Sequence, residues 1–358
     1  MSNAALPVAL VRRGYSSSGG AEAYLLRLAG GLKTRGCEVT LYTSEEWPEE
    51  RWTFGPIVRL KGRTPQKFAE AFAEARDPDQ AILTLDRVPG CDVFRAGDGV
   101  HAAWLHRRGN FEPKWRKFLH LINPKHLSMM RLECEVFQSV REVIANSALV
   151  ADEIVRWHDF PRERIHVVPN GIGRPLPAVP REEARKKLDL PADAFCILFV
   201  GTGWERKGLK FATQAVEKLG KNAILLVAGR GPVHEYRSAC ARFLGPVSDL
   251  AALFSAADVF TLPTIYDPFS NACLEALAAG RPVVTTKANG FSEILTPGVH
   301  GDVVDAGDVS ALTDALAPWK GRDREQTTRA CQALAAEYTI ERNVSSTLAV
   351  LGAAAGLS

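Results

Sequence analysis

One stretch of the sequence joins the start of a helix to acidic side chains, a combination that suits a ligand carrying both phosphates and hydroxyl groups. Within residues 261–285, an apolar strand ends at Pro263, and Ser270 is a residue type that caps the helix expected after it. The first turn of a helix leaves backbone N–H groups unpaired and carries partial positive charge, so it attracts anions. We therefore expect a phosphate to lie over Phe269, Ser270 and Asn271.

Two carboxylates bracket this helix start, Asp267 in the loop before it and Glu275 one turn inside it. Because carboxylates do not bind phosphate, their natural partners on an anionic ligand are hydroxyl groups. A diphosphate between two polyols, as in a nucleotide sugar, would satisfy the stretch, with Glu275 at the ribose and Asp267 at the transferred sugar. The alternative is structural, a solvated turn acid and a glutamate on the helix surface.

Two cations follow the first expected strand of the second half of the chain. The strand 195–200 leads into a short glycine loop and then into Arg206 and Lys207. Both suit a diphosphate, since arginine binds phosphate through its planar fork and lysine as a point charge. The loop Gly201-Thr-Gly203 lacks the third glycine of the dinucleotide fingerprint, so that motif is absent here.

The first half of the chain contributes two further candidate surfaces. The strand 8–11 runs into a serine- and glycine-rich loop and a helix opening near Gly20, an arrangement that lets a ligand approach the backbone closely. A flexible strand–helix turn is the structural alternative. Asp98 and His101 come just beyond another short strand, where one of them is expected to contact the acceptor or act in catalysis, unless both are structural.

Length and composition set the frame for these sites. A chain of 358 residues with 46% hydrophobic residues is too long for one core, and its alternation of strands and helices predicts two α/β domains. Three prolines between positions 175 and 180 suggest a connection, so we place the boundary near Asn170. A net charge of +3 is too small to indicate a nucleic-acid partner.

Several kinds of site and compartment are not expected. The apolar residues 4–11 are followed by two arginines, so they predict a first strand instead of a signal peptide or membrane span, and a cytoplasmic protein. The seven cysteines are scattered and never form a CxxC pair, which indicates reduced thiols and no zinc site. Asp77-Pro-Asp79 fits the DxD metal pattern, but its position between a helix and a strand predicts a turn.

The segment 104–131 combines cations and aromatic side chains with only one acid, Glu112. Its cations are Arg107, Arg108, Lys114, Arg116, Lys117, Lys125 and Arg131, and its aromatic residues include Trp104, Phe111, Trp115 and Phe118. Because cations bind lipid phosphates while rings lie at headgroup depth, we expect peripheral contact with an anionic membrane surface, on the inner face. A solvated basic helix is the alternative, and no nucleic-acid-binding motif accompanies the segment.

Several motifs taken together resemble a known family. They are SGGAE from Ser18, ANS from Ala145, VVPNGI from Val167, RKG from Arg206, GRGP from Gly229 and the pair Asp267 and Glu275. In this order they resemble the family-4 retaining glycosyltransferases of the GT-B fold, over nearly the entire chain. The segments FRAGDGVHA and WERKG are most similar to the branch that moves glucose from UDP-glucose to a heptose of the lipopolysaccharide core.

This resemblance implies an α/β architecture of two Rossmann-like domains facing a cleft. Residues 1–169, completed by 339–358, would form the acceptor-side domain, and residues 170–338 the nucleotide-sugar-binding domain. The final helix, from about Thr339, would cross back to the first domain. The donor site would hold no metal, and no cofactor is expected beside a UDP-sugar, which is the donor substrate.

The resemblance also implies a role for each residue at the donor. Gly19 and Gly20 would approach the donor diphosphate, while Arg206 and Lys207 would neutralise it. Glu275 would bind the ribose hydroxyl groups. The departing diphosphate gains negative charge, so these cations would stabilise the transition state more than the ground state.

Asp267 stands where the family usually carries glutamate, whose side chain is one methylene longer, and would contact the transferred sugar. Asp98 and His101 would orient the acceptor, a sugar or a lipid-linked glycan, and complete the expected catalytic set with Arg206 and Lys207. An oxygen of the diphosphate can take the acceptor's proton on the same face, so retention needs no covalent protein nucleophile. A nucleotide-sugar epimerase and a non-catalytic, membrane-associated sugar-binding protein stay open as alternatives.

Overall fold

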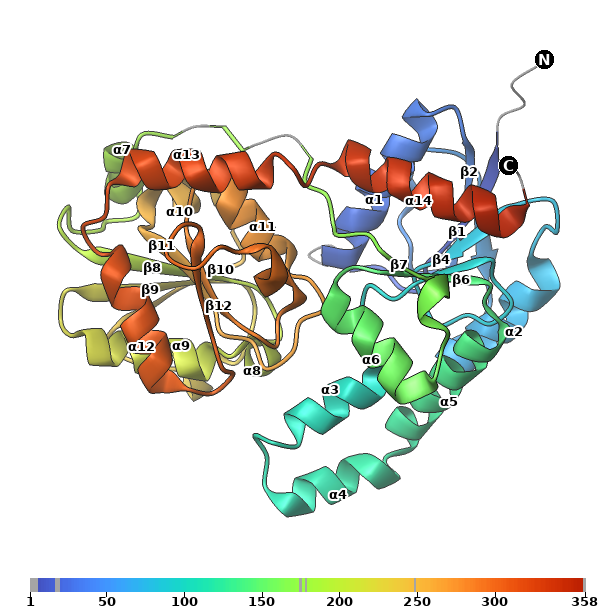
Figure 1. Ribbon diagram of the computed structural model, residues 1–358, viewed down its shortest axis with the longest axis horizontal. Coiled ribbons are helices and arrows are strands. Elements are labelled where there is room, and N and C mark those ends of the chain that lie inside the picture. The colour runs from blue at the N-terminus through green and yellow to red at the C-terminus, as the bar shows by residue number, and fades with distance from the viewer. Residues whose placement is uncertain (1–5, 17–19, 174–175, 178, 248, 357–358) are drawn as a thin grey trace. The chain divides into compact units, whose positions relative to one another are not determined.

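The computed structural model of the protein (Figure 1) describes residues 6–16, 20–173, 176–177, 179–247 and 249–356. The chain divides into two compact units, Met1–Gly171 with Thr339–Ser358, and Ile172–Tyr338. Each unit consists of one parallel sheet and the helices that pack on it. The expected fold class, two Rossmann-like α/β domains with the last helix returning to the first, is confirmed.

The first unit is built on a seven-stranded sheet with the order β3-β2-β1-β4-β5-β6-β7. Its strands are β1 (Pro7–Val11), β2 (Glu38–Ser44), β3 (Ile57–Leu60), β4 (Ala81–Thr84), β5 (Val93–Arg95), β6 (Glu142–Ala145) and β7 (Ile165–Val167). Its helices are α1 (Gly20–Thr34), α2 (Pro65–Ala75), α3 (His101–Arg108), α4 (Lys114–Ile122), α5 (Pro124–Ser139), α6 (Ala148–His158) and α14 (Ile340–Ala355), with 3₁₀ turns at Glu49–Arg51 and Arg162–Arg164.

The last helix, α14, packs against α1 and strand β4 of the first unit. Asn343 is buried in this contact; its side-chain oxygen accepts from the Tyr24 hydroxyl at 2.8 Å, and its amide donates to the Pro169 carbonyl at 2.7 Å. Gly31 of α1 lies so close to Val344 that a Cβ there would collide with it. Hydrogen bonds and close packing therefore make the C-terminal helix part of the first unit.

The second unit is built on a six-stranded sheet with the order β10-β9-β8-β11-β12-β13. Its strands are β8 (Phe195–Val200), β9 (Ala223–Ala228), β10 (Ala241–Gly245), β11 (Val259–Leu262), β12 (Val283–Thr286) and β13 (Gly301–Val304). Its helices are α7 (Arg181–Lys187), α8 (Trp204–Lys207), α9 (Leu209–Leu219), α10 (Leu250–Ala256), α11 (Asn271–Ala278), α12 (Val309–Leu316) and α13 (Arg324–Ala335), with 3₁₀ turns at Val233–Glu235, Gly290–Ile294 and Ala317–Trp319.

The strand order of the second unit reverses direction between β8 and β11. From β8 the chain moves outward through β9 and β10, and it then returns to β11 and moves outward the other way. In open parallel sheets, ligands bind where the order reverses, beyond the carboxyl ends of the strands. The loops after β8 and β11 carry Arg206, Lys207 and Asp267, so the topology gathers these residues at the expected place.

Two further expectations concern membranes and thiols. None of the helices in the described part of the chain is long and apolar enough to cross a membrane. All seven cysteines lie among the described residues and are free thiols, most of them buried. Burial raises the pKa of the Cys273 thiol to about 12 and that of Cys196 to about 11, so these two are packing residues and not nucleophiles.

Candidate active site

The short helix α8 holds both predicted diphosphate-binding cations, Arg206 and Lys207. The backbone carbonyl of Arg206 accepts from the Ile265 N–H at 2.9 Å and from the Thr264 hydroxyl at 2.7 Å. These bonds fasten α8 to the loop after β11. Gly208 permits the contact, because it has a φ of 76° and a Cβ at this position would collide with the Pro263 carbonyl.

An ion pair joins the two loops through their side chains. Nζ of Lys207 lies 2.6 Å from Oδ2 of Asp267, and the two side chains are only 15% and 6% exposed. The backbone of Asp267 is also fixed, since its N–H donates to the Ala288 carbonyl and its carbonyl accepts from the Gly290 N–H, both at 2.9 Å. The lysine expected at the diphosphate and the acid expected at the sugar are therefore direct neighbours.

The start of α11 is formed as expected, with Ser270 as its cap: the Ser270 hydroxyl accepts from the Cys273 N–H. The three residues predicted to lie under the phosphate differ in their exposure, however. Ser270 is only 1% exposed, and its own N–H donates to the Asn289 side chain at 3.3 Å. Ser270 therefore positions the helix, and of the three residues expected under the phosphate, Phe269 is buried while Asn271 is half-buried.

Asn289 is a site residue that the sequence analysis did not identify. It is fully buried, and its Oδ1 accepts from the N–H groups of Ser270 and Phe291 while its Nδ2 donates to the Thr285 hydroxyl at 3.0 Å. It thus ties the end of β12 to the start of α11. The available signal was its place in an Asn-Gly pair just beyond a strand, a position typical of turns, which does not reveal such distant partners.

Glu275, the predicted ribose-binding residue, is half-buried on α11, the helix that Ser270 caps. The second unit therefore holds Arg206, Lys207, Asp267 and Glu275 on loops and helices at the carboxyl edge of one sheet. Together they offer cations for phosphate and carboxylates for hydroxyl groups. This is the chemistry that a nucleotide sugar requires.

Gly20, Asp98 and His101, predicted residues of the first unit, lie at the carboxyl edge of the other sheet. Gly19 falls outside the described residues, and Gly20 is exposed at the start of α1. The Asp98 side chain is half exposed, and its Oδ2 lies 3.5 Å from a guanidinium nitrogen of Arg12. Asp98 and His101 both belong to the segment that connects β5 with α3 and begins that helix.

Arg12 was missed by the sequence analysis, and it organises this edge. Its guanidinium pairs with Glu22 at 3.2 Å, with Asp86 at 3.3 Å and with Asp98. Burial disfavours its charge, but the carboxylates of Asp86, Asp98 and Glu22 outweigh burial and raise the pKa of Arg12. The sequence could not show this cluster, because its members come from four separate segments.

His101 is held by a buried glutamate. Its backbone N–H donates to both carboxylate oxygens of Glu133, at 3.0 and 2.9 Å, and Arg87 pairs with the same carboxylate at 2.7 Å. The ring Nε2 lies 3.1 Å from Nδ1 of His126. Burial, and then the charges of Arg87 and His126, lower the pKa of His101 to about 4. A neutral imidazole suits a hydrogen bond to an acceptor hydroxyl.

Metal binding has no candidate in the described residues, since no group of three or more His, Cys, Asp or Glu side chains is arranged to hold an ion. The DxD-like segment is a turn as expected, with the Asp79 N–H donating to the Asp77 carboxylate at 3.0 Å. A donor site without metal stays a prediction.

The basic aromatic segment 104–131 forms α3, α4 and the start of α5. The side chain of Glu112, the one acid of the segment, is 3% exposed and binds Arg108 and His120, so part of the positive charge is paired within the segment. The helix α4 differs: Trp115, Phe118, Leu119 and Ile122 are 60%, 62%, 48% and 53% exposed. These positions recur with helical spacing and form one apolar face, here called the α4 face.

Two family models match the chain, one over each half. The model described as Glycosyltransferase Family 4 matches residues 18–173. The model described as Glycosyl transferases group 1 matches residues 194–318. The matched ranges contain the predicted site residues, Gly19 to His101 in one and Arg206 to Glu275 in the other.

Relatives that match most of the chain are also glycosyltransferases. The lipopolysaccharide core biosynthesis glycosyltransferase LpsE of Rhizobium meliloti (strain 1021) is 27% identical over 319 residues, which cover 84% of this chain and 86% of LpsE. The lipopolysaccharide glucosyltransferase WaaG of Escherichia coli (strain K12) is 23% identical over 319 residues, which cover 81% of this chain and 83% of WaaG.

Solved structures share the fold at lower identity. A crystal structure of WaaG gives a TM-score of 0.77 at 19% identity and covers 96% of this chain and 99% of that one. The structure of Anabaena Alr3699/HepE in complex with UDP-glucose gives a TM-score of 0.73 at 17% identity, with coverage of 96% and 99%. At such identities the likeness shows the fold alone.

The role of Asn289 predicts a loss of stability on truncation. Asn289→Ala leaves the buried N–H groups of Ser270 and Phe291 without their acceptor, which should lower the free energy of unfolding by about 1–3 kcal/mol. Urea titration of the full chain measures this change. Lys287→Ala, which removes an exposed ion pair, is the matched control and should change stability by less than about 1 kcal/mol. Equal stability of the two variants would refute the role of Asn289.

Proposed function

Because this chain is a glycosyltransferase of the GT-B fold, we propose that it moves a hexose, glucose from UDP-glucose, to a hydroxyl group of a sugar acceptor with retention of configuration. The matches over both halves are to glycosyltransferases, so the epimerase and the non-catalytic binding protein are not retained.

The observation that carries the proposal is the Lys207–Asp267 pair at the point where the sheet order reverses. A phosphate-binding cation and a hydroxyl-binding acid lie side by side there, so one ligand with a phosphate next to a sugar can engage both. Glu275, on the neighbouring helix, would bind the ribose. The complex of HepE with UDP-glucose, a protein of the same fold, supports this choice of donor.

The proposed reaction breaks the bond between the sugar C1 and the diphosphate oxygen and forms a bond from C1 to the acceptor oxygen. The acceptor's proton passes to a diphosphate oxygen on the same face of the sugar. Arg206 and Lys207 stabilise the charge that develops on the diphosphate. Asp98 and neutral His101 would position the acceptor hydroxyl through hydrogen bonds.

We place the reaction in the synthesis of the lipopolysaccharide core or another cell-envelope glycan, at the cytoplasmic side of the inner membrane. LpsE and WaaG, whose names assign them to lipopolysaccharide synthesis, support this setting. An acceptor carried on a lipid would explain why a helix of the first unit presents an apolar face. Heptose is the acceptor sugar that the sequence resemblance suggests.

The donor-site cations should be required for turnover. Arg206→Ala or Lys207→Ala should each lower kcat by on the order of a hundredfold, because each removes a charge that acts most strongly as the leaving group ionises. Release of UDP from UDP-glucose in the presence of acceptor measures the effect. Lys210→Ala, an exposed cation of the neighbouring helix, is the control and should keep normal turnover. Near-normal rates in both site variants would show that Arg206 and Lys207 do not bind the donor diphosphate.

Asp267 should act on the sugar and not on the nucleotide. Asp267→Asn should reduce transfer at least tenfold while the Kd for UDP does not rise, because the change removes a carboxylate and leaves the cations in place. Titration of UDP by calorimetry, paired with initial rates, separates the two effects. A parallel loss of UDP affinity and transfer would show that Asp267 is structural or contacts the nucleotide.

We also propose that the α4 face docks on an anionic membrane. Four large apolar side chains exposed on one face of a helix are unusual for a soluble surface, and Lys114, Arg116 and Lys117 on the same helix are exposed. The apolar face can enter the headgroup region while the cations bind lipid phosphates. Each cation near such a surface contributes about 1 kcal/mol, so binding is reversible.

Vesicle co-sedimentation tests this docking. The native protein should bind anionic vesicles at low salt and ignore neutral ones, while Arg116→Glu/Lys117→Glu should weaken binding at least tenfold. Trp115→Ser/Phe118→Ser should weaken it and leave a more salt-sensitive remainder. Arg329→Glu, on an exposed surface of the second unit, is the control. If the charge-reversed protein sediments like the native one, the segment is a solvated basic face.

A further inference from the structure

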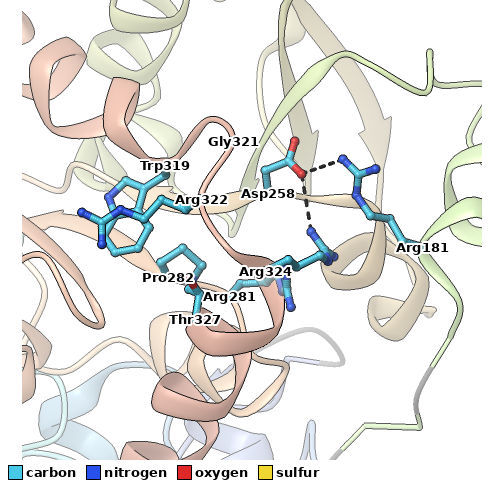
Figure 2. Close-up of a pocket in the computed structure, with 9 residues that line it drawn as sticks. All are labelled: Arg181, Asp258, Arg281, Pro282, Trp319, Gly321, Arg322, Arg324 and Thr327. Atoms are coloured by element: carbon cyan, nitrogen blue, oxygen red, sulfur yellow. Dashed lines mark hydrogen bonds and ion pairs between the residues drawn. The ribbon is translucent and has the colours of Figure 1, made fainter.

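A cavity of about 270 Å³ lies at the amino edge of the second unit's sheet (Figure 2). Asp258 comes directly before β11 and Pro282 directly before β12, and both line the cavity. Lys207 and Asp267 come after the carboxyl ends of β8 and β11. Because the sheet is parallel, the cavity and the candidate active site lie at opposite edges of it.

The lining of this cavity is strongly cationic. Four of its residues are arginines, Arg181, Arg281, Arg322 and Arg324, and its one acid is Asp258. That carboxylate is already shared: Oδ1 lies 2.8 Å from Arg181 and 3.4 Å from Arg324, and Oδ2 lies 2.8 Å from a further arginine, Arg185. Figure 2 shows Arg181 and Arg324 converging on it. One negative charge therefore offsets only a part of the positive charge.

Arg281 is the most buried of the four arginines that line the cavity. It is 4% exposed, and its hydrogen bonds go to neutral groups, the Thr328 hydroxyl at 2.6 Å and the Ala279 carbonyl at 3.3 Å. Across the described part of the chain it has no carboxylate within ion-pair distance. A buried charge without a counter-charge is costly unless a ligand supplies one.

Burial and neighbouring positive charges disfavour the charged form of two arginines of the cluster. Burial lowers the pKa of Arg281 to about 10, and burial together with the nearby Arg281 guanidinium lowers the pKa of Arg324 to about 9. An anion in the cavity would raise the pKa values of both arginines. Arg181 also has a buried Nε atom that finds no partner in the described structure, so a donor is available for such an anion.

The remaining walls suit a small ligand. Arg322 lies over the Trp319 ring, 4.5 Å from its centroid, which holds the guanidinium in place. Thr327 and Arg324 come from the first turn of the twelve-residue helix α13, whose partial positive charge adds to the cluster. The volume lies just under the range of about 300–1,000 Å³ typical of pockets for larger organic ligands.

We propose that this arginine cavity binds a small phosphorylated compound with two or more negative charges, of about the size of inorganic pyrophosphate. Guanidinium groups match phosphate oxygens in pairs, and several of them converge on this one space. The site is separate from the donor site, so its occupancy does not depend on the proposed transfer reaction.

The test uses inorganic pyrophosphate in metal-free buffer on the full chain carrying Arg206→Ala, which weakens the donor site and leaves the Lys207–Asp267 ion pair intact. Calorimetry should show binding at one site. Adding Arg322→Gln/Arg324→Gln should raise the Kd at least tenfold, since two charge-assisted contacts are lost. Arg329 is an exposed arginine of α13, the helix that carries Arg324. Adding Arg329→Gln instead should change the Kd less than twofold.

Arg324 also binds the Ala257 and Ser255 carbonyls, so its replacement carries a risk to folding. Arg322→Gln alone is the second variant, because the Arg322 side chain is exposed and its replacement carries little risk to folding. This variant should still raise the Kd for pyrophosphate at least threefold. Absence of binding in the background protein, or equal Kd values in the cavity variants and the Arg329→Gln control, would overturn the proposal. Equal displacement by chloride at matched ionic strength would overturn it as well.

Discussion

The ion pair between Lys207 and Asp267 is the constraint on which the candidate active site depends. It joins the loop after β8 to the loop after β11 at the point where the strand order of the second unit's sheet reverses. Both side chains are nearly buried, so removal of either partner would leave a charge without compensation, a loss of about 3–5 kcal/mol for a fully buried pair. The backbones are fixed independently, through the Arg206 carbonyl and through Asp267 itself. The pair is therefore built on a rigid frame.

This pairing has a chemical consequence for the donor. With Lys207 offset by Asp267, the side-chain charges left in the two loops are Arg206 and the exposed Glu205, and the start of α11 adds partial positive charge. A ligand that brought phosphate alone would meet repulsion from Asp267, whereas a ligand with hydroxyl groups beside its phosphates gives that carboxylate donors to accept from. The site thus favours a diphosphate that carries a sugar over a bare diphosphate. Ser270 and Asn289 contribute by holding the helix start in place.

Local features of the chain could be predicted from the sequence, and long-range contacts could not. The Ser270 cap and the Asp77 turn follow from residue types at close spacing, and the apolar strand 195–200 is found as β8. Lys207 and Asp267 are 60 positions apart, and nothing in either segment shows that their side chains meet.

The same limit explains what was missed in the first unit. Arg12 and Glu133 hold Asp98 and His101, yet they come from other segments and have no motif of their own. The α4 face shows the opposite case, since its helical spacing is present in the sequence at positions 115, 118, 119 and 122. The spacing alone would equally fit a helix face packed in the core. The structure shows that these four side chains are exposed, which makes the face a candidate docking surface.

Hydrogen–deuterium exchange with and without UDP-glucose tests most directly the claim that the carboxyl edge of the second sheet is the donor site. Bound donor should slow exchange in residues 201–208 and 264–275, which contain the two joined loops and the start of α11, because ligand contacts suppress local opening. The amino edge around 256–258 and 281–282 should be unaffected. Protection confined to that amino edge, or absent from both joined loops at saturating UDP-glucose, would contradict the account.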